Sequence, residues 1–131
     1  MPTGYLTRIV EFTATHSFPD LPEFHGATHD HSHRYRCAVT VKGPFDPTRG
    51  GVMGLNALDG LLQREVVDRF DGRHINKDIA SFAAGTWIAT GESVAVYLWE
   101  RIIGGLPPGV LLHRVRIEEG PHLYSEYYGE P

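Results

Sequence analysis

The sequence predicts a single domain of the α+β class, in which two helices cover a four-stranded sheet. Apolar and polar residues alternate along two segments near the start of the chain and two near its end, as in strands with one buried face. Between them lie two segments whose apolar residues recur at helical spacing. The length of 131 residues and the hydrophobic content of 41% suit one domain, residues 1–131, with a substantial core.

The first two strands are expected at residues 5–16 and 33–43. The inward face of the first holds Leu6, Val10, Phe12, Ala14 and His16. The inward face of the second holds Tyr35, Cys37, Val39 and Val41. Residues 17–30 contain two prolines and a glycine among many polar groups, which predicts a long irregular connection between the two strands.

The remaining elements follow in order. A first helix is expected over residues 55–70, and a second begins at the N-cap Thr90 and ends at Gly104-Gly105. The irregular residues 71–90 between them are expected to carry function, because long loops in a compact domain seldom lack a role. Strands at 110–119 and 122–129 end the chain, with Leu111, Val115, Ile117 and Glu119 on one face.

Composition and charge exclude several classes of function. The net charge is -4 and there is no basic run, so no nucleic-acid partner is expected. A single cysteine excludes an intrachain disulfide. The N-terminal residues lack the charged start and apolar stretch of a signal peptide, and no apolar segment approaches the roughly 20 residues of a membrane helix. We therefore expect a cytoplasmic protein, whose open sheet edges favour oligomerisation.

Histidines gather where the first two predicted strands would meet. His16 ends the inward face of the first strand, and His31 and His33 begin that of the second. If these strands pair antiparallel, the three imidazoles meet at one end of the sheet. Three histidine ligands with an open fourth position are typical of a catalytic zinc site. The alternative is a solvated polar loop without a metal, and we assign the nearby His29 to that loop.

A carboxylate also falls on an inward face. Glu119 continues the face of Leu111, Val115 and Ile117, whereas Glu118 belongs to the opposite face. A carboxylate there needs a donor, and the planar guanidine-like edge of a ligand would be a good bidentate partner. The alternative is a glutamate that reaches solvent at the end of its strand.

Five segments that span nearly the whole chain are informative when taken together: "FTATHSF", "HSHRYRCAVTVKGPFDPTRGGVMGLNALDGLL", "ATGESVAVYLWERI", "LPPGVLLHRVRIEE" and "YYGE". In this order they resemble the 6-pyruvoyl-tetrahydropterin synthase and 6-carboxytetrahydropterin synthase family. The resemblance implies the tunnelling fold (T-fold), in which a four-stranded antiparallel sheet with two helices on one face trimerises into a twelve-stranded barrel. Two such trimers usually stack into a hexamer.

The resemblance also implies a function. Members act on dihydroneopterin triphosphate, from which they remove triphosphate while rearranging the side chain, or release acetaldehyde. The resemblance further implies a pterin pocket at a subunit interface and a zinc ion bound by His16, His31 and His33. Glu119 would grip the amino-pyrimidine edge of the pterin, and Thr90 and Glu92 match a second pterin-contacting segment.

The sequence departs from the family pattern at its catalytic positions. The family thiolate corresponds to His25 or Ala27, and in the family's Asp-His pair Asp71 is retained while the histidine is Gly72. Cys37 cannot substitute, because it lies four residues beyond His33 on the core face.

Loss of these groups lowers the expected rate of the standard synthase reaction by at least about 10²–10⁴-fold. His25 is the candidate replacement base. His74 and Glu23 are weaker candidates, because we expect both to be surface loop residues without a catalytic role. Three hypotheses remain: a divergent zinc-dependent lyase that acts on an altered substrate, a non-catalytic pterin-binding protein, or a chain that has also lost its metal.

Overall fold

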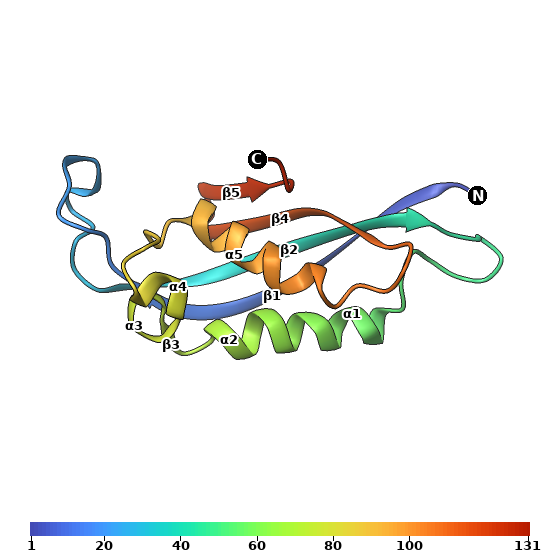
Figure 1. Cartoon of the computed structure of the whole chain (residues 1–131), viewed down its shortest axis with the longest axis horizontal. Helices are drawn as coiled ribbons and strands as arrows, with labels where there is room; N and C mark the ends of the chain where they lie inside the picture. The colour runs from blue at the N-terminus through green and yellow to red at the C-terminus, as the bar shows by residue number, and fades with distance from the viewer.

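The long hairpin of β1 and β2 forms the centre of the fold. A computed structural model describes all 131 residues, with one five-stranded sheet in the order β3-β1-β2-β4-β5 (Figure 1). Strands β1 (Thr3–His16) and β2 (His31–Pro44) pair antiparallel along their whole length, and His16 lies opposite His31. The antiparallel pairing that the predicted histidine cluster required is therefore confirmed.

The other strands extend this hairpin on both sides. Strand β4 (Leu111–Gly120) pairs antiparallel with β2, and β5 (Leu123–Tyr127) pairs antiparallel with β4. The sequence predicted four strands, but there is a fifth, β3 (Arg73–His74), which runs parallel to β1. With two residues, β3 is too short to leave an alternating pattern in the sequence.

The start of β4 differs from the prediction by one residue. Leu111 was expected to face inward, but it is 60% exposed, whereas Leu112 is 9% exposed. The register between β2 and β4 shifts at Thr40 and Val41, which leaves His113 as an extra residue on β4. Such a bulge reverses the alternation. Beyond it, Val115 and Ile117 face the core as predicted.

Both predicted helical regions form. The first is α1 (Leu55–Leu62), which continues through the π-helical turn η2 (Gln63–Val67) into α2 (Asp68–Phe70). The second is α5 (Gly91–Ile103), and the hydroxyl of Thr90 accepts a hydrogen bond from the Ser93 N–H, which confirms the predicted N-cap. The segment expected to be irregular contains β3, α3 (Ile75–Asp78) and α4 (Ala80–Ala83), and the connection between β1 and β2 contains the single turn η1 (Pro22–Phe24).

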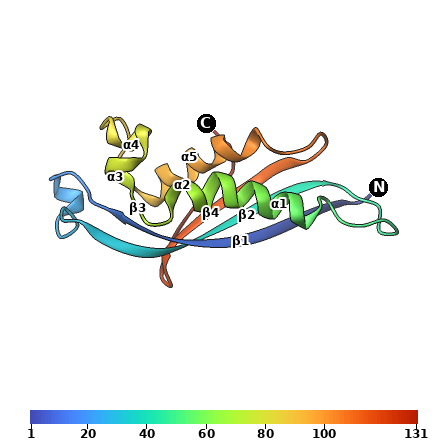
Figure 2. The same cartoon turned by 90° about the horizontal axis from the view of Figure 1, so that it is seen from below.

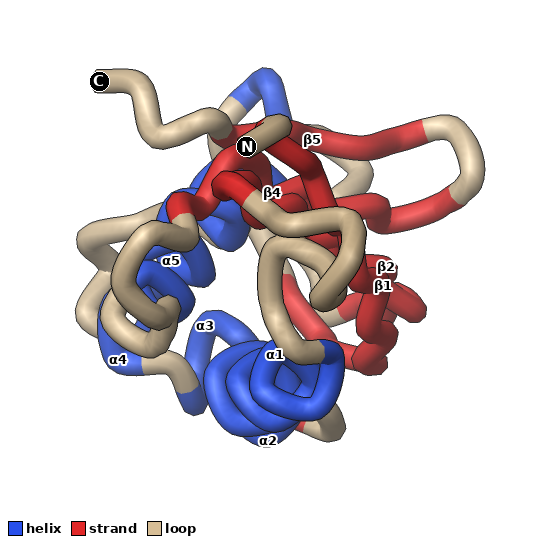
Figure 3. The backbone as a smooth tube through the Cα atoms, turned by 90° about the vertical axis from the view of Figure 1, so that its right-hand side faces the viewer, coloured by secondary structure: helices blue, strands red, loops and turns tan.

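The helices cover one face of the sheet, as Figures 2 and 3 show. The core lies between the helices and the sheet and contains 22 buried hydrophobic residues. Phe12 joins the two layers, since its ring stacks on Tyr35 of β2 at 5.0 Å and contacts Phe70 of α2 at 5.2 Å between centroids. Aromatic pairs of this kind fix the position of the helices over the hairpin.

The two edges of the sheet remain open. The outer side of β5 has no neighbouring strand, and β3 covers β1 only at Ala14 and Thr15. Such edges present unpaired backbone groups to a second chain. None of the helices has the length and apolar character needed to cross a membrane.

Candidate metal centre and adjoining cavity

Three histidines converge at the end of the hairpin. His31 and His33 lie on the same face of β2, and His16 reaches them from β1. One nitrogen of each ring lies within 4.8 Å of those of the other two. The distances between ring centroids are 4.5 Å from His16 to His31 and 5.0 Å from His16 to His33. A metal ion could be bound between such nitrogens by all three imidazoles.

The orientation of His16 and the neutral state of its ring both suit a metal ligand. Its Nδ1 lies 2.8 Å from the carbonyl oxygen of Ala89 and donates to it, whereas its buried Nε2 has no hydrogen-bond partner. Burial lowers the pKa of His16 to about 4, so the ring is neutral at pH 7. The Nε2 atom of this neutral ring is therefore free to bind a metal ion between His16, His31 and His33.

The other two histidines are supported in the same way. His31 Nδ1 lies 2.9 Å from the carbonyl oxygen of His29. The pKa of His33 is lowered mainly by burial and then by the charge of His31, while a hydrogen bond to the backbone of Glu119 opposes the shift. Carbonyl partners of this kind fix the tautomer and the orientation of ligating histidines. His29 therefore contributes its backbone, although its side chain had been assigned to the loop.

The histidines open into a cavity of about 490 Å³ at this end of the sheet. Its walls contain all six residues to which the sequence assigned metal or pterin binding: His16, His31, His33, Thr90, Glu92 and Glu119. Sequence reasoning missed the remaining lining residues, which are Phe18, Phe24, Gly91, Leu123, Tyr124 and Ser125. The Phe18 and Phe24 rings stack at 4.8 Å within the 17–30 connection, where no periodic pattern could have identified them.

Glu119 places a carboxylate beside the three histidines. Its side chain is 9% exposed, and its Oε1 lies 3.9 Å from His16 Nε2. Burial is the main cause of its raised pKa, followed by the charge of Glu92, while His31 acts in the opposite direction. Glu92 accepts a hydrogen bond from the hydroxyl of Ser125 at 3.2 Å. Two carboxylates thus line a cavity in which a ligand with N–H donors would be favoured.

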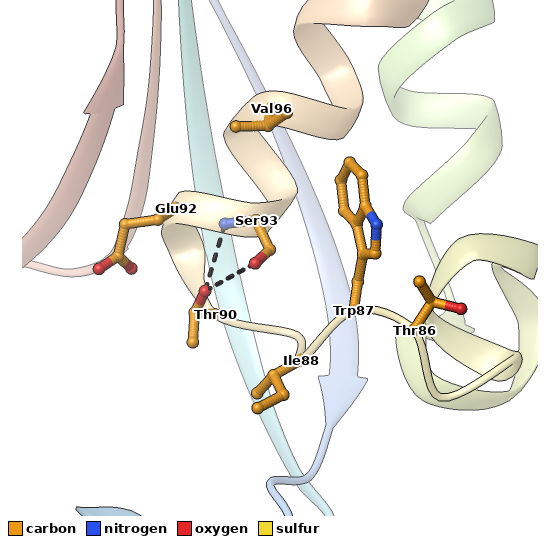
Figure 4. Close-up of a pocket in the computed structure, with 7 residues that line it drawn as sticks. All are labelled: Thr86, Trp87, Ile88, Thr90, Glu92, Ser93 and Val96. Carbon is orange, nitrogen blue, oxygen red and sulfur yellow. Dashed lines mark hydrogen bonds between the residues drawn. The ribbon is translucent and has the colours of Figure 1, made fainter. Parts of the chain in front are cut away.

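A second hollow of about 550 Å³ adjoins this cavity and shares Thr90 and Glu92 with it. It is lined by Thr86, Trp87, Ile88, Thr90, Glu92, Ser93 and Val96 (Figure 4). The carboxylate of Glu92 points away from Trp87 and toward the strands, consistent with its bond to Ser125 (Figure 4). The first turn of α5, which carries Glu92, therefore lies between the cavity and this second hollow.

Gly91 allows Glu119 to lie close to α5. A Cβ atom at Gly91 would lie 2.9 Å from Glu119 Oε2 and 2.8 Å from Ser125 Oγ. We expect Gly91→Ala to change the free energy of unfolding by less than about 1 kcal/mol, because the atoms in the way end flexible side chains. If the cavity binds a pterin, as the resemblance implies, we expect the substitution to weaken that binding roughly tenfold or more, since Glu119 must move.

Fluorescence titration with neopterin, together with thermal unfolding, tests this expectation. Gly60→Ala in α1 is the matched control, because a Cβ there meets no atom within 4 Å. If Gly91→Ala bound neopterin as tightly as the wild type, the close approach would have no role in ligand binding.

The two predicted catalytic residues lie outside this cavity. Asp71 is exposed, and its Oδ1 accepts a hydrogen bond from the Thr13 N–H of β1 at 2.9 Å. The side chain of His25 is 71% exposed and lies 4.0 Å from Asp20. Glu23, in η1, is also exposed. Within one chain, therefore, neither predicted catalytic group meets the three histidines.

Cys37 is fully buried, and burial raises its pKa to about 12. We expect no reaction of the folded protein with Ellman's reagent at pH 8, because the thiol is both protonated and inaccessible. Unfolding in guanidinium should release one reactive thiol per chain. Stoichiometric labelling of the folded protein would contradict the assignment of Cys37 to the core.

Comparison with known proteins identifies the family. The family model described as 6-pyruvoyl tetrahydropterin synthase matches residues 5–130. This chain belongs to the 6-pyruvoyl tetrahydropterin synthase family. It is 32% identical to 6-pyruvoyl tetrahydrobiopterin synthase of Poecilia reticulata, over 97% of this chain and 91% of that protein.

Solved structures of this family share the fold. The 6-pyruvoyl tetrahydropterin synthase of Caenorhabditis elegans superimposes with a TM-score of 0.87 at 30% identity, covering 99% of this chain and 98% of the other. That of Plasmodium vivax, solved with a catalytic glutamate replaced by cysteine, gives 0.69 at 14% identity, covering 97% of this chain and 98% of the other. The T-fold predicted from the sequence is therefore confirmed for this chain.

Proposed function

We propose that this member of the 6-pyruvoyl tetrahydropterin synthase family binds zinc on His16, His31 and His33 and a pterin-like ligand on Glu119. The observation that carries the proposal is that three converging imidazoles and one buried carboxylate share a single cavity. Zinc held by these three histidines would supply Lewis-acid chemistry, by which a coordinated substrate oxygen is polarised and the neighbouring carbon-bound proton becomes more acidic. Glu119 would orient the ligand through its amino-pyrimidine edge, with Thr90 and Glu92 beside it.

The proposed reaction is lyase chemistry on dihydroneopterin triphosphate or a related pterin, altered from the standard synthase reaction. His25 is the proposed replacement base, and Asp71 the retained member of the relay. For His25 to act, the 17–30 connection must turn its exposed ring toward the cavity when the ligand binds. The second proposed function is pterin binding without catalysis. The position of His25 outside the cavity favours this alternative.

A homo-oligomer would supply Asp71 from a neighbouring copy. Asp71 lies against β1 at Thr13, next to the two-residue edge strand β3, and the cavity is lined by Leu123, Tyr124 and Ser125 of the opposite edge strand β5. Pairing β1 of one copy with β5 of the next would bring Asp71 toward the neighbour's cavity. Three copies joined in this way would close a barrel, and we propose a hexamer of two such trimers. Light scattering with size-exclusion chromatography measures the assembly.

Incubation of the purified, zinc-loaded protein with dihydroneopterin triphosphate distinguishes the two functions. Chromatography would detect release of triphosphate and the pterin product. Turnover that His25→Ala abolishes and His29→Ala leaves intact supports the lyase and its proposed base. Saturable binding without turnover supports the non-catalytic alternative. If the protein neither bound nor converted a pterin, the proposal would be wrong.

A further inference from the structure

The 17–30 connection joins two of the three proposed metal ligands, His16 and His31, and projects from one end of the sheet (Figures 1 and 2). Most of its residues are exposed. It is stabilised internally by the hydrogen bond from Phe18 N–H to the Ala27 carbonyl and by the stacked rings of Phe18 and Phe24. Phe18 also contacts the ring of His16, at 4.8 Å between centroids, so this part of the connection packs beside the proposed ligands.

Residues of β3 and α3 hold this connection at both of its ends. At the start, the side-chain amide of Asn76 forms two hydrogen bonds with the backbone of Ser17, accepting from its N–H at 2.9 Å and donating to its carbonyl at 3.0 Å. At the end, His74 Nε2 lies 3.0 Å from Asp30 Oδ1. Ser17 directly follows His16, and Asp30 directly precedes His31. Each contact is therefore one residue away from a proposed ligand.

The segment that makes these contacts is itself well anchored. His74 lies opposite Thr15 in the pairing of β3 with β1, and its side chain is 15% exposed. Its backbone N–H donates to the Asp78 carboxylate at 2.8 Å. Ile75, between the two contact residues, is fully buried in the core. His74 and Asn76 thus connect the exposed loop to a fixed part of the fold.

We propose that His74 and Asn76 are positioning residues of the metal centre, which hold Asp30 and Ser17 so that His16 and His31 are arranged before the metal binds. This proposal rests on the proposed zinc site and assigns a role to a segment outside it. A loop free at either end would have to be ordered upon binding, and that ordering would reduce the affinity for the metal. Supporting contacts outside the ligand set commonly change metal affinity by about 10–100-fold.

The test measures the affinity of the protein for Zn²⁺ by chelator competition and the visible spectrum of its Co²⁺ form. We expect Asp30→Ala and Asn76→Ala each to weaken Zn²⁺ binding by about 10–100-fold. Asp30→Asn keeps an oxygen acceptor for His74 and should retain most of the affinity. Lys77→Ala is the matched control, because Lys77 is 70% exposed and only reaches Asp30 at 4.0 Å. It should leave the affinity unchanged.

Two further readouts separate positioning from general stability. Thermal unfolding of metal-free Asp30→Ala should stay close to that of the wild type, since Asp30 is 55% exposed. Asn76→Ala leaves both backbone groups of Ser17 without this partner, so its Tm is measured beside its affinity. Amide hydrogen exchange of residues 17–30 should be faster in the Asp30 and Asn76 alanine variants. If Asp30→Ala and Asn76→Ala both kept the wild-type affinity and Co²⁺ spectrum, the positioning role would be overturned, whereas the proposed zinc site would be unaffected. A wild-type protein that bound neither ion would overturn the zinc site and the positioning role together.

Discussion

Replacing His16 with alanine should nearly abolish zinc binding and also destabilise the metal-free protein. Zinc binding in zinc fingers is worth about 10–16 kcal/mol over four ligands, so one ligand contributes roughly 3 kcal/mol, or a hundred-fold or more in affinity. His16 is fully buried, and its Nδ1 donates to the carbonyl of Ala89. Its truncation leaves a cavity and an unpaired carbonyl, which should cost at least about 2 kcal/mol.

Two measurements and one control test this expectation. Metal content by mass spectrometry and chelator competition should show the loss of zinc, and the Tm of the metal-free variant should fall by about 5 °C or more. His29→Ala removes an exposed imidazole but leaves the carbonyl that holds His31 in place, so it should match the wild type in both. Stoichiometric zinc in the His16 variant would mean that the metal is bound elsewhere.

Replacing Glu119 with alanine should remove most of the affinity for a pterin. A buried carboxylate that pairs with a planar donor edge contributes about 3 kcal/mol when its loss leaves that edge unpaired, or roughly a hundred-fold in Kd. The fold should tolerate the change, because the nearest ionic partner of Glu119, His16, is neutral at pH 7 and 3.9 Å away.

Glu118→Ala is the matched control for this substitution. Glu118 is the adjacent residue of β4, but it does not line the cavity and lies 3.7 Å from Arg116. Calorimetric titration with neopterin should therefore separate the two variants by about two orders of magnitude, the difference expected for a buried charge. Equal affinity in both would show that the ligand is not anchored by Glu119.

Much of the site could be predicted because its residues lie on strands. Side chains alternate along a strand, so His31 and His33 must share a face and Glu119 must follow Ile117 toward the core. The same argument failed for Leu111, because a bulge between β2 and β4 changes the alternation. A bulge depends on how the strands pair, and a single strand's pattern does not reveal it.

The catalytic part could not be predicted in the same way. His25 and Asp71 were chosen from their positions along a resembling sequence, and both lie outside the cavity of their own chain. His25 is in an irregular connection whose course has no periodicity. Asp71 is held by the backbone of Thr13, 58 residues away in the chain. Only an arrangement of several copies would bring Asp71 to a metal centre.

The strands, the two helical regions and the three histidines able to bind a metal could be predicted from local periodicity and residue type. The family, and with it the placement of both helices on one face of the sheet, came from the resemblance of several segments. Which of these groups share a cavity depends on how the elements pack together. The tertiary structure also decided that His74 meets Asp30 and that Asn76 meets Ser17. These contacts join residues 44 and 59 positions apart, and they form only when the chain brings β3 beside β1. Side-chain alternation has a period of two residues and carries no information about contacts between residues so far apart in the sequence.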